Sequence, residues 1–125
     1  MSPMAPFLVF LIDAVLVVVF SAFGRGAHSE GLGVAQIWGT AWPFLLALLV
    51  GWVAVLAMRR APTAVSTGVI LWLTTLVGGM TVRGLSEGGV PHWSFILVAG
   101  LVTALFLIGW RLLALAVKKR RAHAN

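Results

Sequence analysis

Four long apolar runs constrain the fold of this chain more than any other feature of its sequence. They cover about residues 4–23, 38–58, 64–82 and 93–117. Each reaches the length of about 20 residues that a helix needs to cross the hydrocarbon core of a bilayer. We therefore predict an all-α polytopic membrane protein, in which one domain over residues 1–125 holds four transmembrane helices in a compact bundle and ends in a basic tail, residues 118–125.

The composition agrees with a membrane protein. Hydrophobic residues make up 61% of the chain and charged residues 10%, whereas roughly a quarter of residues are charged in soluble domains. The absence of cysteine excludes disulfides, thiolate nucleophiles and cysteine-bound metals. The net charge of +6 comes from residues at the ends of the apolar runs, so we attribute it to membrane topology and expect no nucleic-acid partner.

The basic residues also predict an orientation. Arg59 and Arg60 lie between the second and third runs, and four consecutive basic residues, 118–121, follow the fourth. The positive-inside rule places these segments in the cytoplasm. We therefore expect a multi-pass protein of the cell (plasma) membrane with both termini cytoplasmic and the other two loops outside.

A weak internal repeat has an offset of 58 residues. It aligns Arg25-Gly26 with Arg83-Gly84, and Gly51-Trp52 with Gly109-Trp110. Two tandem helical hairpins of the same orientation would give this pattern. Chance matches among frequent glycines would give it as well, so both explanations stay open.

Asp13 is an acid inside the first predicted span. It lies about 13 Å along the helix from Met4, near the expected bilayer centre, and Thr74, Thr75 and Thr103 fall at about the same depth. A carboxylate facing lipid there would be unfavourable, so we expect it to face the bundle. It is either a neutral acid hydrogen-bonded to a threonine or a backbone carbonyl, or a carrier of protons or cations.

Aromatic and basic residues mark the expected membrane interfaces. The predicted interface set is Trp38, Trp42, Trp93, Trp110 and Arg111. Tryptophans at the ends of spans act as interfacial anchors. Arg111 lies roughly 27 Å along the fourth span, close to the cytoplasmic interface. We expect its side chain to snorkel to lipid phosphate, and the alternative is an inward extension toward Asp13.

Enzymatic machinery is not evident. Asp13 is roughly 22 Å of helix away from His28, which is too far for a Ser-His-Asp arrangement. The sequence contains no phosphate-binding loop, dinucleotide fingerprint or His-Glu-x-x-His motif, and the outer-loop His and Glu residues match no standard metal spacing. We assign no catalytic residue, metal or cofactor, and we expect no enzymatic activity.

Several segments together resemble a known family. They are Asp13, Phe23-Gly24-Arg25 with His28, Ala41-Trp42-Pro43-Phe44, Gly79-Met80 with Arg83, Phe95 with Val98-Ala99, and Gly109-Trp110-Arg111. The pattern resembles the small bacterial and archaeal membrane proteins, actinobacterial ones among them, that form domain-of-unknown-function family 3054. The resemblance implies a compact four-span membrane protein, and it implies no activity.

Arg25, His28 and Arg83 lie at the outer ends of predicted helices, where two loops can meet. Two arginines near tryptophans suit an anionic group, either a lipid headgroup phosphate or a small carboxylated or phosphorylated solute. Alternatively, the arginines complement the dipoles at the C-terminal ends of the first and third spans.

Three functional hypotheses follow. The first is a small transporter or channel-like protein with Asp13 as its titrating group, which would need a homo-oligomer because four short helices enclose little cavity. The second is an accessory or assembly subunit of a larger membrane complex. The third is an anionic-lipid-binding protein. We place the first slightly ahead, because an acid at the bilayer centre is unfavourable to keep, and the bilayer itself is the expected partner in all three.

Overall fold

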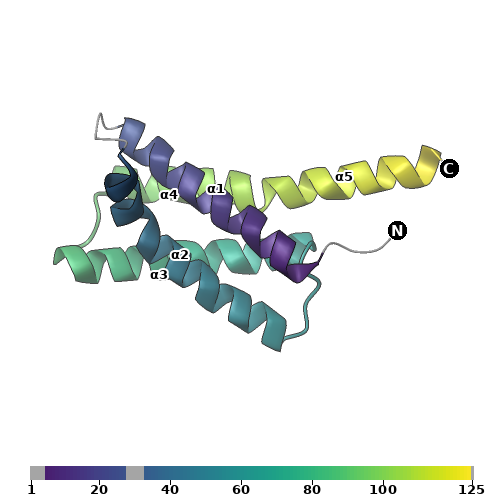
Figure 1. Ribbon diagram of the computed structural model, residues 1–125, viewed down its shortest axis with the longest axis horizontal. Helices are drawn as coiled ribbons and strands as arrows, with labels where there is room; N and C mark the ends of the chain where they lie inside the picture. The colour runs from purple at the N-terminus through teal and green to yellow at the C-terminus, as the bar shows by residue number, and fades with distance from the viewer. Residues whose placement is uncertain (1–4, 28–32, 125) are drawn as a thin grey trace.

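The computed structural model describes residues 5–27 and 33–124, and the side chains of residues 5–23 and 33–123. Within these ranges the chain is helical, with no strand. The helices are α1 (Pro6–Ala27), α2 (Val34–Ala57), α3 (Val65–Glu87), α4 (Trp93–Leu107) and α5 (Gly109–Ala124) (Figure 1). α1, α2, α3 and the combined α4 and α5 are each long and apolar enough to cross a membrane, which confirms the predicted fold class.

Two helices extend beyond the apolar runs that predicted them. α3 continues to Glu87, so Arg83 lies inside the helix rather than after it. Gly88 ends α3 in the left-handed conformation (φ 77°), a backbone geometry that glycine adopts without strain. α5 continues through the basic residues 118–121, so the predicted tail is helical up to Ala124.

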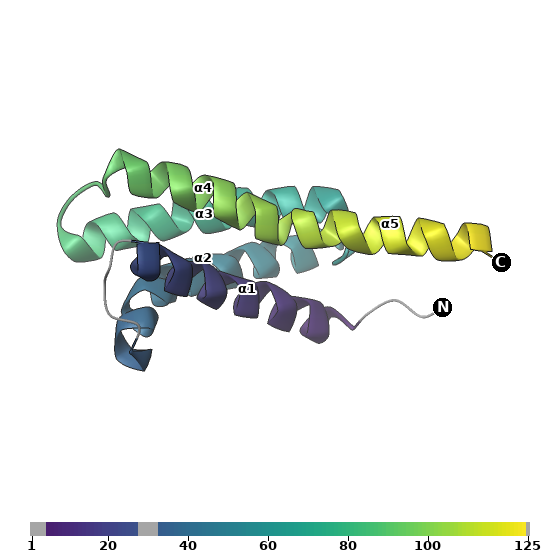
Figure 2. The ribbon, with the colours of Figure 1, turned by 90° about the horizontal axis from the view of Figure 1, so that it is seen from above.

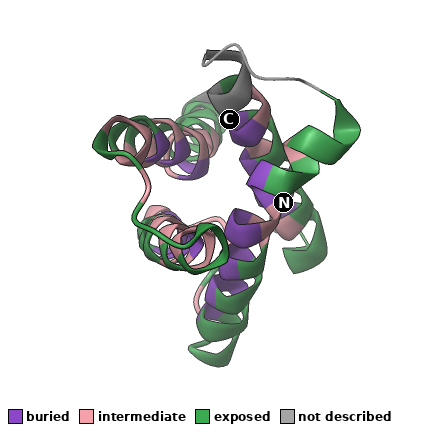
Figure 3. Cartoon of the chain, turned by 90° about the vertical axis from the view of Figure 1, so that its left-hand side faces the viewer, coloured by how far each residue is buried: buried purple, intermediate pink, exposed green. Residues whose placement is uncertain are grey.

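The helices form a ring in which neighbours along the chain are also neighbours in space. α1 packs against α2 and α4, and α3 packs against the same two helices (Figure 2). Viewed along the bundle, the buried residues lie on the sides of the helices that face one another (Figure 3). The ring order places the first helix directly beside the fourth, so residues from both ends of the chain meet in the core.

Small residues allow α2 and α3 to approach closely. A Cβ on Gly79 would overlap the ring of Phe44, and one on Gly78 would lie 2.9 Å from Cβ of Ala47. A Cβ on Gly51 would lie 3.1 Å from Thr74. The two helices therefore pack at glycine positions, as helix pairs in membranes commonly do.

α4 and α5 follow each other with little interruption. The Ile108 N–H donates to the Ala104 carbonyl at 3.0 Å, and the Leu112 N–H donates to the Ile108 carbonyl at 3.0 Å. These i→i−4 bonds carry the helix across the junction. α5 then runs past the end of the bundle, as Figures 1 and 2 show.

Candidate functional site

Asp13 lies on the inner stripe of α1. Val9, Asp13, Val17 and Phe20 recur at helical spacing and are all at most 1% exposed. The carboxylate therefore points into the bundle and not toward the exposed outer face of α1.

Arg111 forms a bidentate ion pair with this carboxylate. Its Nη1 donates to Oδ1 and its Nη2 donates to Oδ2 of Asp13, both at 2.8 Å. Nη1 also donates to the Leu107 carbonyl at 2.9 Å, and Nε donates to the Pro62 carbonyl at 3.0 Å. Both charged side chains are 0% exposed. Parallel N–H bonds from a guanidinium to a carboxylate are among the strong hydrogen bonds of proteins.

Two tryptophans complete the coordination of Asp13. Trp52 on α2 donates its indole N–H to Oδ2 at 3.0 Å, and Trp110 on α5 donates its indole N–H to Oδ1 at 2.9 Å. Each carboxylate oxygen thus accepts two hydrogen bonds, which fills the roughly four lone-pair sites of an ionised carboxylate. We call Asp13, Trp52, Trp110 and Arg111 the clamp, because it joins α1, α2 and α5.

The backbone around the clamp is shaped to hold the arginine. A Cβ on Gly68 of α3 would lie 2.7 Å from Cδ of Arg111 and 3.1 Å from the Leu107 carbonyl oxygen, so a glycine makes room for the guanidinium. The loop that supplies the Pro62 carbonyl is itself anchored, because the Thr67 hydroxyl donates to the Ala61 carbonyl at 2.7 Å. The clamp therefore lies near the end of the bundle that carries the α2–α3 loop.

The clamp differs from the sequence-based expectations in two respects. We expected Arg111 to snorkel, and this was wrong, because the side chain is buried and extends inward to Asp13. The alternative, an inward extension of Arg111 toward Asp13, is the arrangement found, and the long side chain of arginine spans the difference in depth. The expected threonine partner is not found either: the hydroxyls of Thr74 and Thr103 donate to backbone carbonyls of their own helices, and the Thr75 hydroxyl is buried with no hydrogen-bond partner among the described residues.

The other predicted interface residues differ in exposure. Trp38 is 60% exposed and Trp93 is 70% exposed, whereas Trp42 and Trp110 are half-buried. Exposed indoles at helix ends suit an interfacial position. The anchoring role of Trp38, Trp42 and Trp93 stays a prediction, whereas the indole N–H of Trp110 is engaged in the clamp.

The predicted outer patch falls largely outside the described side chains. His28 lies outside the described residues, and of Arg25 only the backbone, in α1, is described. The guanidinium carbon of Arg83 lies 4.4 Å from the centroid of the Phe95 ring, and its Nε is 3.5 Å from Oε2 of Glu87. That Nε is buried and makes no hydrogen bond to a described residue. Whether Arg25, His28 and Arg83 bind an anion or a lipid headgroup stays a prediction.

An aromatic cluster fills the bundle beside Arg83. The Phe20 and Phe44 ring centroids are 5.4 Å apart, and Phe95 lies 6.4 Å from Phe20 and 6.2 Å from Phe44. These separations are typical of favourable aromatic pairs. The core between the clamp and Arg83 is therefore packed with apolar side chains.

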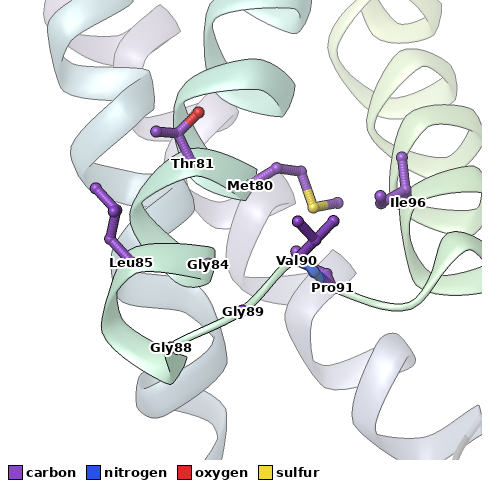
Figure 4. A pocket seen from close by; sticks show the side chains of 9 residues that line it. All are labelled: Met80, Thr81, Gly84, Leu85, Gly88, Gly89, Val90, Pro91 and Ile96. Carbon is purple, nitrogen blue, oxygen red and sulfur yellow. The ribbon is translucent and has the colours of Figure 1, made fainter.

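A surface cavity of about 610 Å³ lies where α3 ends. Figure 4 shows its lining, which includes Met80, Leu85, Val90, Pro91 and Ile96. None of its nine lining residues is charged, and the Thr81 hydroxyl is the one polar side-chain group among them. Among the described residues, no three His, Asp or Glu side chains lie close enough together to hold a metal ion.

The fold and the clamp define a four-span helical membrane protein with an ion pair buried in its core. The model of the family described as "Protein of unknown function (DUF3054)" matches residues 10–114, and the chain belongs to this family. Both charged members of the clamp lie within the matched range, and the resemblance noted in the sequence is confirmed. No curated protein and no solved structure matches the chain.

Proposed function

We propose that this protein is an accessory or assembly subunit of a larger membrane complex, built as a rigid four-helix unit. The observation that carries the proposal is the complete engagement of Asp13, whose two oxygens accept hydrogen bonds from Arg111, Trp52 and Trp110. A carrier must exchange its cargo, whereas a proton arriving here would have to disrupt a buried bidentate pair. Removing one partner of such a pair costs about 3–5 kcal/mol.

The packed interior supports a structural role as well. The rings of Phe20, Phe44 and Phe95 and the side chains of Leu48 and Leu71 occupy the space between the helices. Interiors packed in this way stabilise one arrangement of helices and leave little room for a solute. These contacts favour a subunit that presents its outer surface to partners.

α2 presents a continuous outward stripe that suits a partner helix. Its members are all exposed and recur at helical spacing along the whole of α2: Ala35, Gly39, Leu46, Val50, Val53 and Ala57. A Cβ on Gly39 would meet nothing within 4 Å. Small residues four positions apart, such as Ala35 and Gly39, let two membrane helices approach closely. We propose that this stripe contacts the partner.

The test is extraction at native expression level in a mild detergent, followed by native mass spectrometry. The proposal expects a stable heteromeric mass, and recovery of this chain alone or as a homo-oligomer would contradict it. Gly39→Leu should abolish the heteromer while the helix content is kept, because the added side chain enters open space. The matched control is Val77→Leu on α3, which changes an exposed position (63%) outside the stripe and should leave the heteromer intact.

The proposed location is the plasma membrane, with both termini in the cytoplasm. The support is the charge distribution: Arg59, Arg60 and residues 118–121 are basic, and the sequence has no acid after Glu87. Because the chain has no cysteine, single cysteines report topology directly. A membrane-impermeant maleimide should label Gly89→Cys in intact cells and Ala122→Cys only after lysis, and the reverse pattern would overturn the orientation.

Proton-linked transport is the second candidate function. It is favoured by the Thr75 hydroxyl, which is buried and has no hydrogen-bond partner among the described residues. An unpaired hydroxyl in the bundle interior is a place where a water or a transported ion can bind. Under this hypothesis Asp13→Asn abolishes a proton-linked flux while the protein remains folded, and a normal flux in that variant would exclude it.

A further inference from the structure

We propose that the part of α5 that projects past the bundle binds anionic phospholipid headgroups of one leaflet, and that these headgroups surround the helix on all sides. We call Leu112–His123 the α5 arm; it begins after Arg111, which is held inside the bundle. Figures 1 and 2 show the arm projecting past the other helices. This proposal does not depend on the proposed function.

The arm has an apolar zone followed by a basic zone. In the apolar zone, residues 112–117, Leu112, Leu113, Leu115 and Val117 are 40–67% exposed. Successive residues on a helix are rotated by about 100°, so these side chains point in several directions around the axis. Apolar surface exposed all around a helix is stable when acyl chains surround it.

The basic zone forms a ring of charge. Lys118, Lys119, Arg120 and Arg121 are all exposed and consecutive, so they point in four directions within a rise of about 4.5 Å. A layer of lipid headgroups surrounds a spanning helix on every side at one depth and can meet all four charges. An acidic protein would approach from one side and meet only some of them.

Neither of the two described acids forms an ion pair with the basic zone. The sequence contains only three acids, Asp13, Glu30 and Glu87. Asp13 is buried in the clamp, and Glu87 is the last residue of α3, where its Oε2 lies 3.5 Å from Nε of Arg83. Glu30 lies outside the described residues. Arg60, a basic residue of the α2–α3 loop, already donates to the Ser66 hydroxyl at 2.6 Å. None of the four basic side chains of residues 118–121 makes a described hydrogen bond or ion pair, whereas one of the two loop arginines does.

Helix length brings the ring to the correct depth. From Trp93 to Lys118 the combined α4 and α5 rise by about 38 Å, which exceeds the hydrocarbon thickness of about 30 Å. A tilt of the helix reduces the excess. The basic zone, residues 118–121, then lies at the level of the lipid phosphates, where basic residues attract anionic lipid.

The test uses the full-length protein in nanodiscs that contain phosphatidylglycerol and phosphatidylcholine, with bound lipid counted by native mass spectrometry. The wild type should retain phosphatidylglycerol preferentially. Each charge removed from the ring should lower that preference roughly fivefold at low salt, and added salt should weaken it. The double variant K118Q/K119Q is compared with R59Q/R60Q, which removes the same charge from the loop and should have a smaller effect. Glutamine keeps helix propensity close to that of lysine and arginine.

Single variants distinguish lipids from a one-sided partner. Lys118 and Arg120 are about 200° apart around the helix. If headgroups surround the arm, Lys118→Gln and Arg120→Gln should lower the preference equally. A lower phosphatidylglycerol preference in only one of these two variants would overturn the proposal. So would the absence of any phosphatidylglycerol preference in the wild type. A preference abolished equally by R59Q/R60Q would also overturn it, because the loop would then be the lipid site.

Discussion

Replacing Asp13 by leucine should destabilise the protein strongly, because it leaves the guanidinium of Arg111 buried with only backbone carbonyls as hydrogen-bond acceptors. Those acceptors are the carbonyls of Pro62 and Leu107. An arginine keeps its charge in proteins, so it cannot adapt by losing a proton. Breaking a buried ion pair on one side costs about 3–5 kcal/mol. We expect about 4 kcal/mol, which is nearly a thousandfold in the folding equilibrium.

Replacing Arg111, the other member of the ion pair, should cost less stability. Arg111→Met leaves the carboxylate with two indole donors, from Trp52 and Trp110. A carboxyl group, unlike a guanidinium, can also become neutral by taking up a proton. We expect a loss of about 2–3 kcal/mol. The double variant Asp13→Leu with Arg111→Met removes both charges, and it should recover much of the stability lost in Asp13→Leu.

The four proteins of this double-mutant cycle can be compared by unfolding in mixed micelles with increasing dodecyl sulfate, followed by circular dichroism. Val15→Leu on α1 is the control, because Val15 is 59% exposed on the outer face of the same helix. An interaction energy of more than about 1 kcal/mol is expected for groups in contact. Additive losses, or a loss below about 1 kcal/mol in Asp13→Leu, would refute the idea that the ion pair holds the helices together.

Four further changes test the packing around the clamp and between the helices by the same unfolding measurement. Gly68→Ala should lose about 1–3 kcal/mol, because its Cβ would lie 2.7 Å from Cδ of Arg111. Gly79→Ala should lose a similar amount against the facing ring on α2, whereas Gly39→Ala should be neutral or slightly stabilising, since it meets open space; equal effects at the three glycines would contradict the packing. Trp52→Phe removes one of the hydrogen bonds to the carboxylate and should lose about 1.5–3 kcal/mol, so an unchanged stability would show that this bond contributes little.

The number and approximate position of the helices could be predicted because each span is a long apolar segment in its own right. Local hydropathy does not report where a helix continues with polar residues. α3 therefore runs past its apolar segment to Glu87, and α5 runs through the basic residues. The Gly88 cap, which ends α3, is a local signal that the sequence did carry.

The clamp was harder to predict than the helices. Asp13 was identified as a polar position in the bundle, but its partners come from α2 and α5. Pairing with Arg111 was only the alternative to snorkelling, because depth counted along straight helices placed Arg111 near the interface. The side-chain reach of arginine and the ring order of the helices close that gap. The 58-residue offset did contain a signal, because it pairs Trp52 with Trp110, the two residues whose indoles bind opposite oxygens of one carboxylate.

The separation of Asp13 and Arg111 along the chain bears on how the protein is made. The two residues are 98 positions apart, so the acid enters the membrane with the first helix, long before its arginine has been synthesised. Until α5 is inserted, the nascent chain carries an uncompensated acid in an apolar environment. A chain that stops before α5 therefore differs chemically from a full-length one, because its Asp13 carboxylate lacks the guanidinium and one of the two indole N–H groups that bind it.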